Sequence, residues 1–152
     1  MHPIVTFTVL STILCGCASI VNETTHPIKI ETKTVEGETI KGARCTLSNN
    51  YGKAHFLSGE TTSVRRSGED LDINCQYPSK PDANGRIISR ANQGMAGNIL
   101  FGGGVGAIID HNKGTAYTYP SWIQLIYGKT LVFDRDHEQE GQPVLGKDID
   151  QK

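Results

Sequence analysis

Apolar and polar residues alternate along much of the chain between positions 27 and 77, which is the pattern of strands with one buried face. Residues 71–77, with the sequence LDINCQY, give the clearest example. Short turns rich in Gly, Asn and Ser separate such segments. Strands are predicted at residues 27–33, 43–48, 53–57, 61–66, 70–77 and 86–90, with a final strand or hairpin at 115–127. Several short strands with regular turns predict a mainly β fold, either a β-sandwich or a small barrel.

The N-terminal residues have the pattern of an export signal. Residues 3–14, PIVTFTVLSTIL, form an uncharged apolar run that suits a signal-peptide core but is shorter than the ~20 residues of a spanning helix. The next residues, LCGC at positions 14–17, resemble a bacterial lipobox. This resemblance implies that residues 1–16 are removed, that Cys17 is acylated, and that Ala18 directs sorting to the outer membrane. A cleaved signal without lipid and a buried N-terminal strand are the alternatives.

Two of the 4 cysteines remain in the mature domain, Cys45 and Cys75. Both fall at inward positions of predicted strands, and an even number of cysteines in an oxidising compartment favours a disulfide. A metal site is a poorer interpretation because two separate cysteines cannot complete a tetrahedral shell. The alternative to a disulfide that would imply an enzyme is a catalytic Cys45 activated by His55.

The segments 42–49, 61–64 and 70–77 resemble the small seven-stranded sandwich of PEGA-like surface domains, within Gram-negative lipoproteins that begin Cys-Ala-Ser-Ile-Val. The resemblance covers about residues 17 to 127. It implies a non-catalytic module outside the cytoplasm and names no ligand. The expected organisation is a signal at 1–16, a tether at 17–26 and an Ig-like or PEGA-like β-sandwich at 27–133. Residues 134–152 are charged and poor in large apolar side chains, which predicts a disordered tail.

A glycine-rich segment interrupts the strand pattern at residues 91–110, ANQGMAGNILFGGGVGAIID. It lacks the phosphate-binding motif G-x-x-x-x-G-K-[ST], so no nucleotide is expected. Gly102 and Gly106 form a GxxxG pair on which two helices could approach closely. The favoured interpretation is a helix or hairpin inserted in the sandwich and packed on it. The alternatives are a segment that contacts a partner or an interface, and insertion of residues 94–109 into a membrane.

Four of the ten aromatic residues gather at 115–127. Their main expected role is structural, and Tyr117, Tyr119 and Trp122 are also candidates for an aromatic edge at a partner interface or a headgroup layer.

Composition narrows the function classes further. Fifteen Lys and Arg against 16 Asp and Glu leave a net charge of -1, which provides no strong field for nucleic acid. No H-E-x-x-H pair or G-x-S-x-G elbow is present, and no cofactor is expected. The sequence therefore predicts a non-enzymatic, lipid-anchored envelope protein with a structural or binding role, facing the periplasm or the cell surface, with an envelope protein as a candidate partner. Its runner-up is an assembly component that inserts or oligomerises through residues 94–109. A hydrolase that uses His55 or His111 is a third class.

Overall fold

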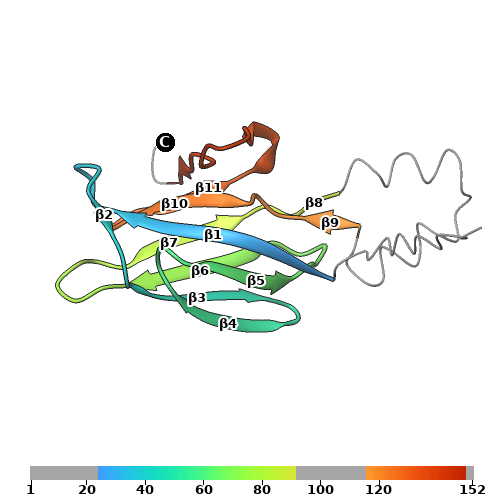
Figure 1. Cartoon of the computed structure of the whole chain (residues 1–152), viewed down its shortest axis with the longest axis horizontal. Coiled ribbons are helices and arrows are strands. Elements are labelled where there is room, and N and C mark those ends of the chain that lie inside the picture. The colour runs from blue at the N-terminus through green and yellow to red at the C-terminus, as the bar shows by residue number, and fades with distance from the viewer. Residues whose placement is uncertain (1–23, 92–115, 150–152) are drawn as a thin grey trace, which may run out of the picture.

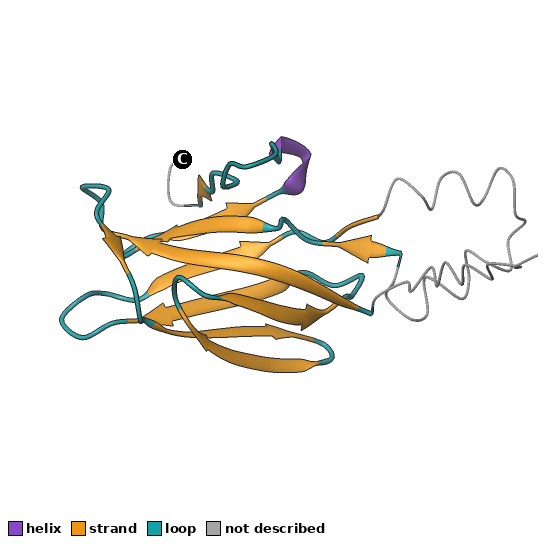
Figure 2. Ribbon diagram, in the orientation of Figure 1, coloured by secondary structure: helices purple, strands orange, loops and turns teal. Residues whose placement is uncertain are grey.

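The computed structural model describes residues 24–91 and 116–149, which form two β-sheets packed face to face and a short pair of strands at one end (Figure 1). The fold is mainly β, as predicted, and is consistent with a β-sandwich. The one helical element among the described residues is the 3-10 turn η1 (Arg135–His137), drawn in purple in Figure 2. None of the helical structure in these two ranges is long and apolar enough to span a membrane.

The first sheet is built around its longest strand, β1. This strand pairs in parallel with β10 on one edge and antiparallel with β5 and then β2 on the other edge. The four strands are β1 (Thr25–Lys33), β2 (Thr39–Ile40), β5 (Thr61–Arg65) and β10 (Trp122–Ile126).

The second sheet has six strands in the order β12-β11-β7-β6-β3-β4. They are β3 (Arg44–Asn49), β4 (Gly52–Leu57), β6 (Leu71–Gln76), β7 (Ala83–Ile87), β11 (Thr130–Phe133) and β12 (Lys147–Asp148). A separate antiparallel pair, β8 (Arg90–Ala91) and β9 (Tyr117–Thr118), flanks the glycine-rich segment. That segment, residues 92–115, lies outside the described residues, as do residues 1–23, so the predictions for Cys17, Gly102 and Gly106 stay predictions.

The consecutive strands β10 and β11 link the two sheets, because each enters a different sheet. β10 lies parallel to β1 in the first sheet, and β11 lies parallel to β7 in the second. Backbone bonds secure the connection, with Tyr127 N donating to Lys33 O at 3.0 Å and Asn84 N donating to Lys129 O at 3.0 Å.

Alternating side chains fill the space between the sheets. β1 and β10 contribute Ile28, Ile30, Ile123 and Leu125, and the second sheet contributes Leu47, Leu71, Ile73, Ile87, Leu131 and Phe133. β7 needs a glycine at its centre: a Cβ on Gly85 would lie 2.9 Å from Leu125 Cδ2 and 3.0 Å from Phe133 Cε2. The strand predicted at residues 86–90 lies earlier in the chain than expected, because β7 begins at Ala83 and ends at Ile87.

A small polar cluster lies within this core and is internally hydrogen bonded. Thr32 Oγ1 donates to Ile40 O at 2.7 Å and lies 3.2 Å from Ser58 Oγ, and Tyr127 OH donates to Thr32 Oγ1 at 3.0 Å. Ala43 N donates to Ser58 Oγ at 3.0 Å. Because each buried hydroxyl has a partner, the cluster avoids the cost of an unpaired polar group and holds β1 against the start of β3.

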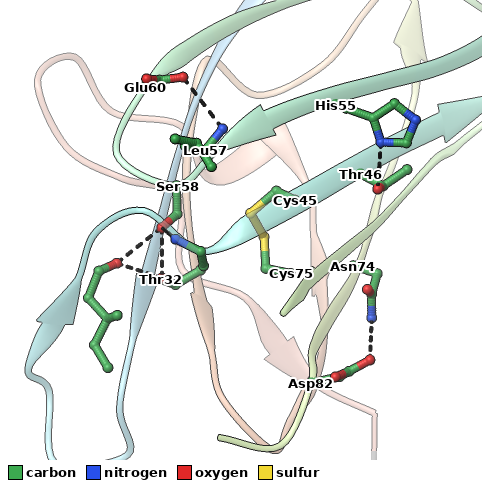
Figure 3. The surroundings of a disulfide bond; sticks show 12 residues. Thr32, Cys45, Thr46, His55, Leu57, Ser58, Glu60, Asn74, Cys75 and Asp82 are labelled. Atoms are coloured by element: carbon green, nitrogen blue, oxygen red, sulfur yellow. Dashed lines mark hydrogen bonds between the residues drawn. A yellow bond between two sulfur atoms is a disulfide. The ribbon is translucent and has the colours of Figure 1, made fainter. Parts of the chain in front are cut away.

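The predicted disulfide between Cys45 and Cys75 is present (Figure 3). Both residues are buried and face inward, as the alternation predicts. They are directly opposed on β3 and β6, with their Cα atoms 4.1 Å apart, so the bridge joins adjacent strands of one sheet. Phe56 and Ala83 stand beside them on the outer neighbours β4 and β7, which completes one inward row across four strands.

The C-terminal residues correct one prediction. Instead of forming a disordered tail from Asp134, residues 134–149 return to the sheets, where β12 pairs with β11 and Val144 bridges to Ile123. Val144 is 2% exposed, whereas the adjacent Leu145 is 77% exposed. Val144, several backbone bonds, the Ser121 N–Glu138 Oε1 bond and the Lys129–Asp148 ion pair therefore dock a segment whose composition is typical of disorder.

We expect loss of the disulfide to lower the free energy of unfolding. The bridge closes a loop with a sequence separation of 30, for which the chain-entropy model gives about 3–4 kcal/mol. Urea unfolding of the Cys45→Ala/Cys75→Ala double variant, compared with oxidised and reduced wild type, measures this difference. The reduced wild type should resemble the variant, and an unchanged midpoint in both would contradict the assignment.

We also expect docking of the C-terminal segment to depend on Val144. Val144→Ala removes two buried methyl groups and should cost about 2 kcal/mol. Leu145→Ala, the matched change at the exposed neighbour, should leave the unfolding midpoint almost unchanged. Equal effects of the two substitutions in urea unfolding would show that the segment is not packed as described.

Candidate functional site

The outward face of the six-stranded sheet carries a continuous set of hydrogen-bonding side chains. Strand alternation places them there, because the residues between the buried positions of β3, β6 and β7 all point away from the core. We call this surface the polar face, and define it by Thr46, Ser48, Lys53, His55, Asp72, Asn74, Gln76, Asn84, Arg86 and Thr130.

One row of the polar face crosses five neighbouring strands. Its members in register are His55, Thr46, Asn74, Asn84 and Thr130. Thr46 Oγ1 and His55 Nδ1 are 3.0 Å apart, and Asn74 Nδ2 donates to Asn84 Oδ1 at 2.8 Å. These contacts hold the side chains in fixed orientations along the row.

The Asp82 carboxylate and the Arg86–Asp72 ion pair flank this row. The Asp82 carboxylate accepts hydrogen bonds from Gln76 Nε2 and Asn74 Nδ2, both at 3.0 Å, and these bonds lower the pKa of Asp82. In the next row, Arg86 Nε donates to Asp72 Oδ1 at 3.0 Å, which raises the pKa of Arg86. The side chains of Arg86 and Asp72 are both more than half exposed. Their ion pair therefore fixes the orientation of these two side chains at the surface and adds little to the stability of the fold.

The polar face is hollowed between these rows. A depression of about 600 Å³ is lined by residues from β3, β4, β6, β7 and β11, with Ile149 at its margin. Its walls are amides, hydroxyls and an ion pair, so it offers both donors and acceptors. Such an arrangement suits recognition of a polar ligand.

This surface was not predicted, although the alternation of residues 71–77 contained its signal. Asp72 points outward from β6, whereas Asp70 precedes β6 and accepts a bond from Ser89 N at 3.0 Å. The same alternation that turns Cys75 inward also turns Asn74 outward. Which strands lie beside β6 could not be inferred from that alternation.

The alternative of a catalytic Cys45–His55 pair is not realised. Cys45 is bonded to Cys75 on the inward face, and His55 stands on the opposite face beside Thr46 (Figure 3). Within residues 24–91 and 116–149, no group of three or more His, Cys, Asp or Glu side chains could hold a metal ion.

The three aromatic candidates do not share one edge. Tyr119 is fully buried, and its hydroxyl donates to Glu69 O at 2.9 Å, so its role is in the core. Tyr117 is half-buried and packs on Gly68, where a Cβ would lie 3.2 Å from the Tyr117 ring. Trp122 is half-buried on the first sheet, with Lys29 Nζ 4.1 Å from its ring centroid. The prediction of an aromatic edge is therefore wrong for Tyr119, because its ring is packed in the core.

One end of the domain gathers the start of β1 and the β8–β9 pair (Figure 1). Arg66 holds these elements together: its Nε donates to Thr25 O at 3.1 Å and its Nη1 donates to Tyr117 O at 3.3 Å. We call this group of contacts the Arg66 clamp. The chain segments on both sides of the glycine-rich residues are thus fixed beside the first residues of β1.

His26 lies behind the Arg66 clamp. It is 7% exposed, its Nδ1 lies 3.2 Å from Thr118 Oγ1, and it meets the Tyr119 ring edge-on. Its Nε2 is buried without a hydrogen-bond partner among the described residues. Burial, followed by the nearby Arg66 charge, lowers the pKa of His26, so the imidazole is neutral in the folded state near neutral pH.

Comparison with protein-family models, with curated proteins and with solved structures finds no match to this chain.

We expect acid to weaken the fold through His26. The unfolded chain takes up a proton near pH 6.5, while the folded chain does so only at lower pH. The unfolded state therefore binds more protons below that value, and stability falls as the pH decreases through it. Urea unfolding between about pH 8 and pH 5 measures this slope. His26→Asn should flatten it, whereas the exposed-site control His55→Asn should not, and an unchanged slope in His26→Asn would contradict the assignment.

Proposed function

We propose that this chain is an exported lipoprotein of the outer membrane, anchored through acylated Cys17, whose PEGA-like β domain is a non-catalytic binding module. The observation that carries the proposal is the buried Cys45–Cys75 disulfide. Structural disulfides form and persist in oxidising compartments such as the bacterial periplasm or the cell surface, and they are rare in the cytosol. The bridge and the lipobox-like residues 14–17 are separate features that indicate the same destination.

The polar face supports the binding role. Its amides and hydroxyls are held in register by side-chain hydrogen bonds, so a ligand would meet donors and acceptors that are already oriented. The depression of about 600 Å³ lies in the size range of ligand sites. An envelope protein or polymer with exposed polar groups is the partner class that this surface fits.

A second candidate function is membrane insertion or oligomerisation through residues 94–109. It is favoured by the position of β8 and β9, from which this segment leaves the domain beside the start of β1. Cys17 precedes Thr25 by eight residues, a span of at most about 29 Å when extended. An anchor at Cys17 would therefore hold the glycine-rich segment close to the bilayer.

Intact-mass spectrometry of the membrane-extracted protein tests the anchor. The expected mass is that of a chain beginning at Cys17 with added acyl groups, and Cys17→Ala should lack them. A wild-type chain that keeps Met1 and carries no acyl group would refute the proposal.

Fractionation of the Cys17→Ala variant separates the two candidate functions. Release into the soluble fraction as a monomer supports the binding module. Persistent membrane association that is lost on Gly102→Leu/Gly106→Leu supports insertion or assembly through residues 94–109.

A further inference from the structure

A second concave surface lies where the C-terminal segment returns past the start of β10. A hollow of about 430 Å³ is lined by Ser121, Trp122, Glu138, Gln139, Glu140, Gly141 and Gln142. A neighbouring hollow of about 380 Å³ shares Gln139 and Gln142 and continues past Pro143, Leu145, Gly146 and Lys147. We call the two together the Trp122 groove. The two hollows adjoin at these two shared residues.

The walls of the Trp122 groove are fixed by hydrogen bonds. Ser121 N donates to Glu138 Oε1 at 2.7 Å, and Val144 N donates to Trp122 O at 2.8 Å. A turn closes the far wall, where Gln142 N donates to Gln139 O at 3.2 Å. The groove therefore has a defined shape in the absence of a ligand.

The groups that face a ligand are an indole and two free amides. Trp122 is half-buried, while Gln139, Glu140 and Gln142 are exposed. Among the described residues, the side chains of these three make no hydrogen bond or ion pair. Each amide offers two donors and an acceptor, the set of groups that hydroxyl-rich ligands need. Apolar surface lies at both ends, from the Trp122 ring and from Leu145, which is 77% exposed.

The charges around the groove nearly balance, so they give no net attraction for an ionic ligand. Glu140 is exposed at one wall and Lys147 is exposed at the far end, while Glu138 is already paired with Arg135 at 3.5 Å. A cation would ordinarily be drawn to an indole face, but Lys29 Nζ already lies 4.1 Å from the Trp122 ring centroid and is held there by Glu31 at 2.9 Å. A second cation at the ring would be repelled by this ammonium group, which covers one face of the indole. A neutral ligand with alternating apolar and hydrogen-bonding surface needs no charged partner.

We propose that the Trp122 groove is a binding site for a neutral oligosaccharide, whose ring faces pack on the part of Trp122 that Lys29 leaves open and whose hydroxyl groups bond to Gln139 and Gln142. Two adjoining hollows provide room for more than one linked sugar. This proposal does not depend on the lipid anchor, because every residue that carries it lies in the folded domain.

Trp122 is the one tryptophan in the chain, so its fluorescence reports directly on the groove. The full chain, extracted in a detergent without a sugar headgroup, is titrated with chitotetraose and with cellotetraose, which differ in their acetamido groups. We expect a saturable change in emission with at least one of them. Saturation by chitotetraose alone would assign the acetamido group to recognition. Absence of a saturable change with both, confirmed by calorimetry, would overturn the proposal.

Variants test whether the groove itself binds. Gln139→Ala/Gln142→Ala should weaken the apparent affinity by about tenfold or more, the effect of losing roughly one net hydrogen bond. Lys80→Ala, a change in an exposed turn outside both the polar face and the groove, should leave it unaltered. Thermal unfolding of each variant checks that the fold is retained, and Trp122→Ala, measured by calorimetry, should abolish binding. Unaltered affinity in the double glutamine variant would overturn the proposal, as would displacement of the sugar by tetramethylammonium.

Discussion

Cys45 and Cys75 lie directly opposite each other on two neighbouring strands in the middle of the six-stranded sheet, and their covalent bond fixes how β3 and β6 are paired. A slip of one residue in either strand would turn every side chain of that strand to the other face. The bridge prevents such a slip. With the cysteines inward, Thr46 and Asn74 must point outward, next to each other, and the rest of the polar face follows from the pairing of β4, β7 and β11 around them.

The two ends of this framework are not equivalent. The Arg66 clamp brings the first residues of β1 and the β8–β9 pair to one end, and Gly128 N bonds to Asp82 O at the other. Two segments with a predicted relation to membranes, the residues that follow the proposed acylation site and residues 94–109, both join the domain at the clamped end. Under the proposed anchor, the opposite end and both concave surfaces of the domain remain available to partners.

Local alternation predicted the mainly β fold and turned both cysteines inward, and the even cysteine count then favoured a disulfide. Features that depend on which strands become neighbours were missed, including the side-by-side placement of the two cysteine strands. β7 was displaced in the prediction because Gly85 breaks the apolar pattern, yet glycine is required there by the close approach of Leu125 and Phe133. The Trp122 groove could not be foreseen, since its far wall belongs to residues that were predicted to be disordered. Val144, one apolar residue in a polar stretch, gives no periodic signal, although its burial docks that wall.

Two aromatic residues that are close in sequence have different roles in the structure. Tyr119 and Trp122 are three positions apart in the sequence, but the chain turns between them, so one ring enters the core and the other remains on the surface of the first sheet. Sequence clustering alone could not separate these roles. Burial decides which of the two can contact a ligand.

The central claim is that the domain is held in register by a disulfide formed outside the cytoplasm. Trapping of thiols in intact cells with a membrane-permeant maleimide, before and after reduction, tests it most directly. The account predicts that Cys45 and Cys75 react only after reduction. Labelling of both residues in unreduced cells would contradict the disulfide and, with it, the proposed location.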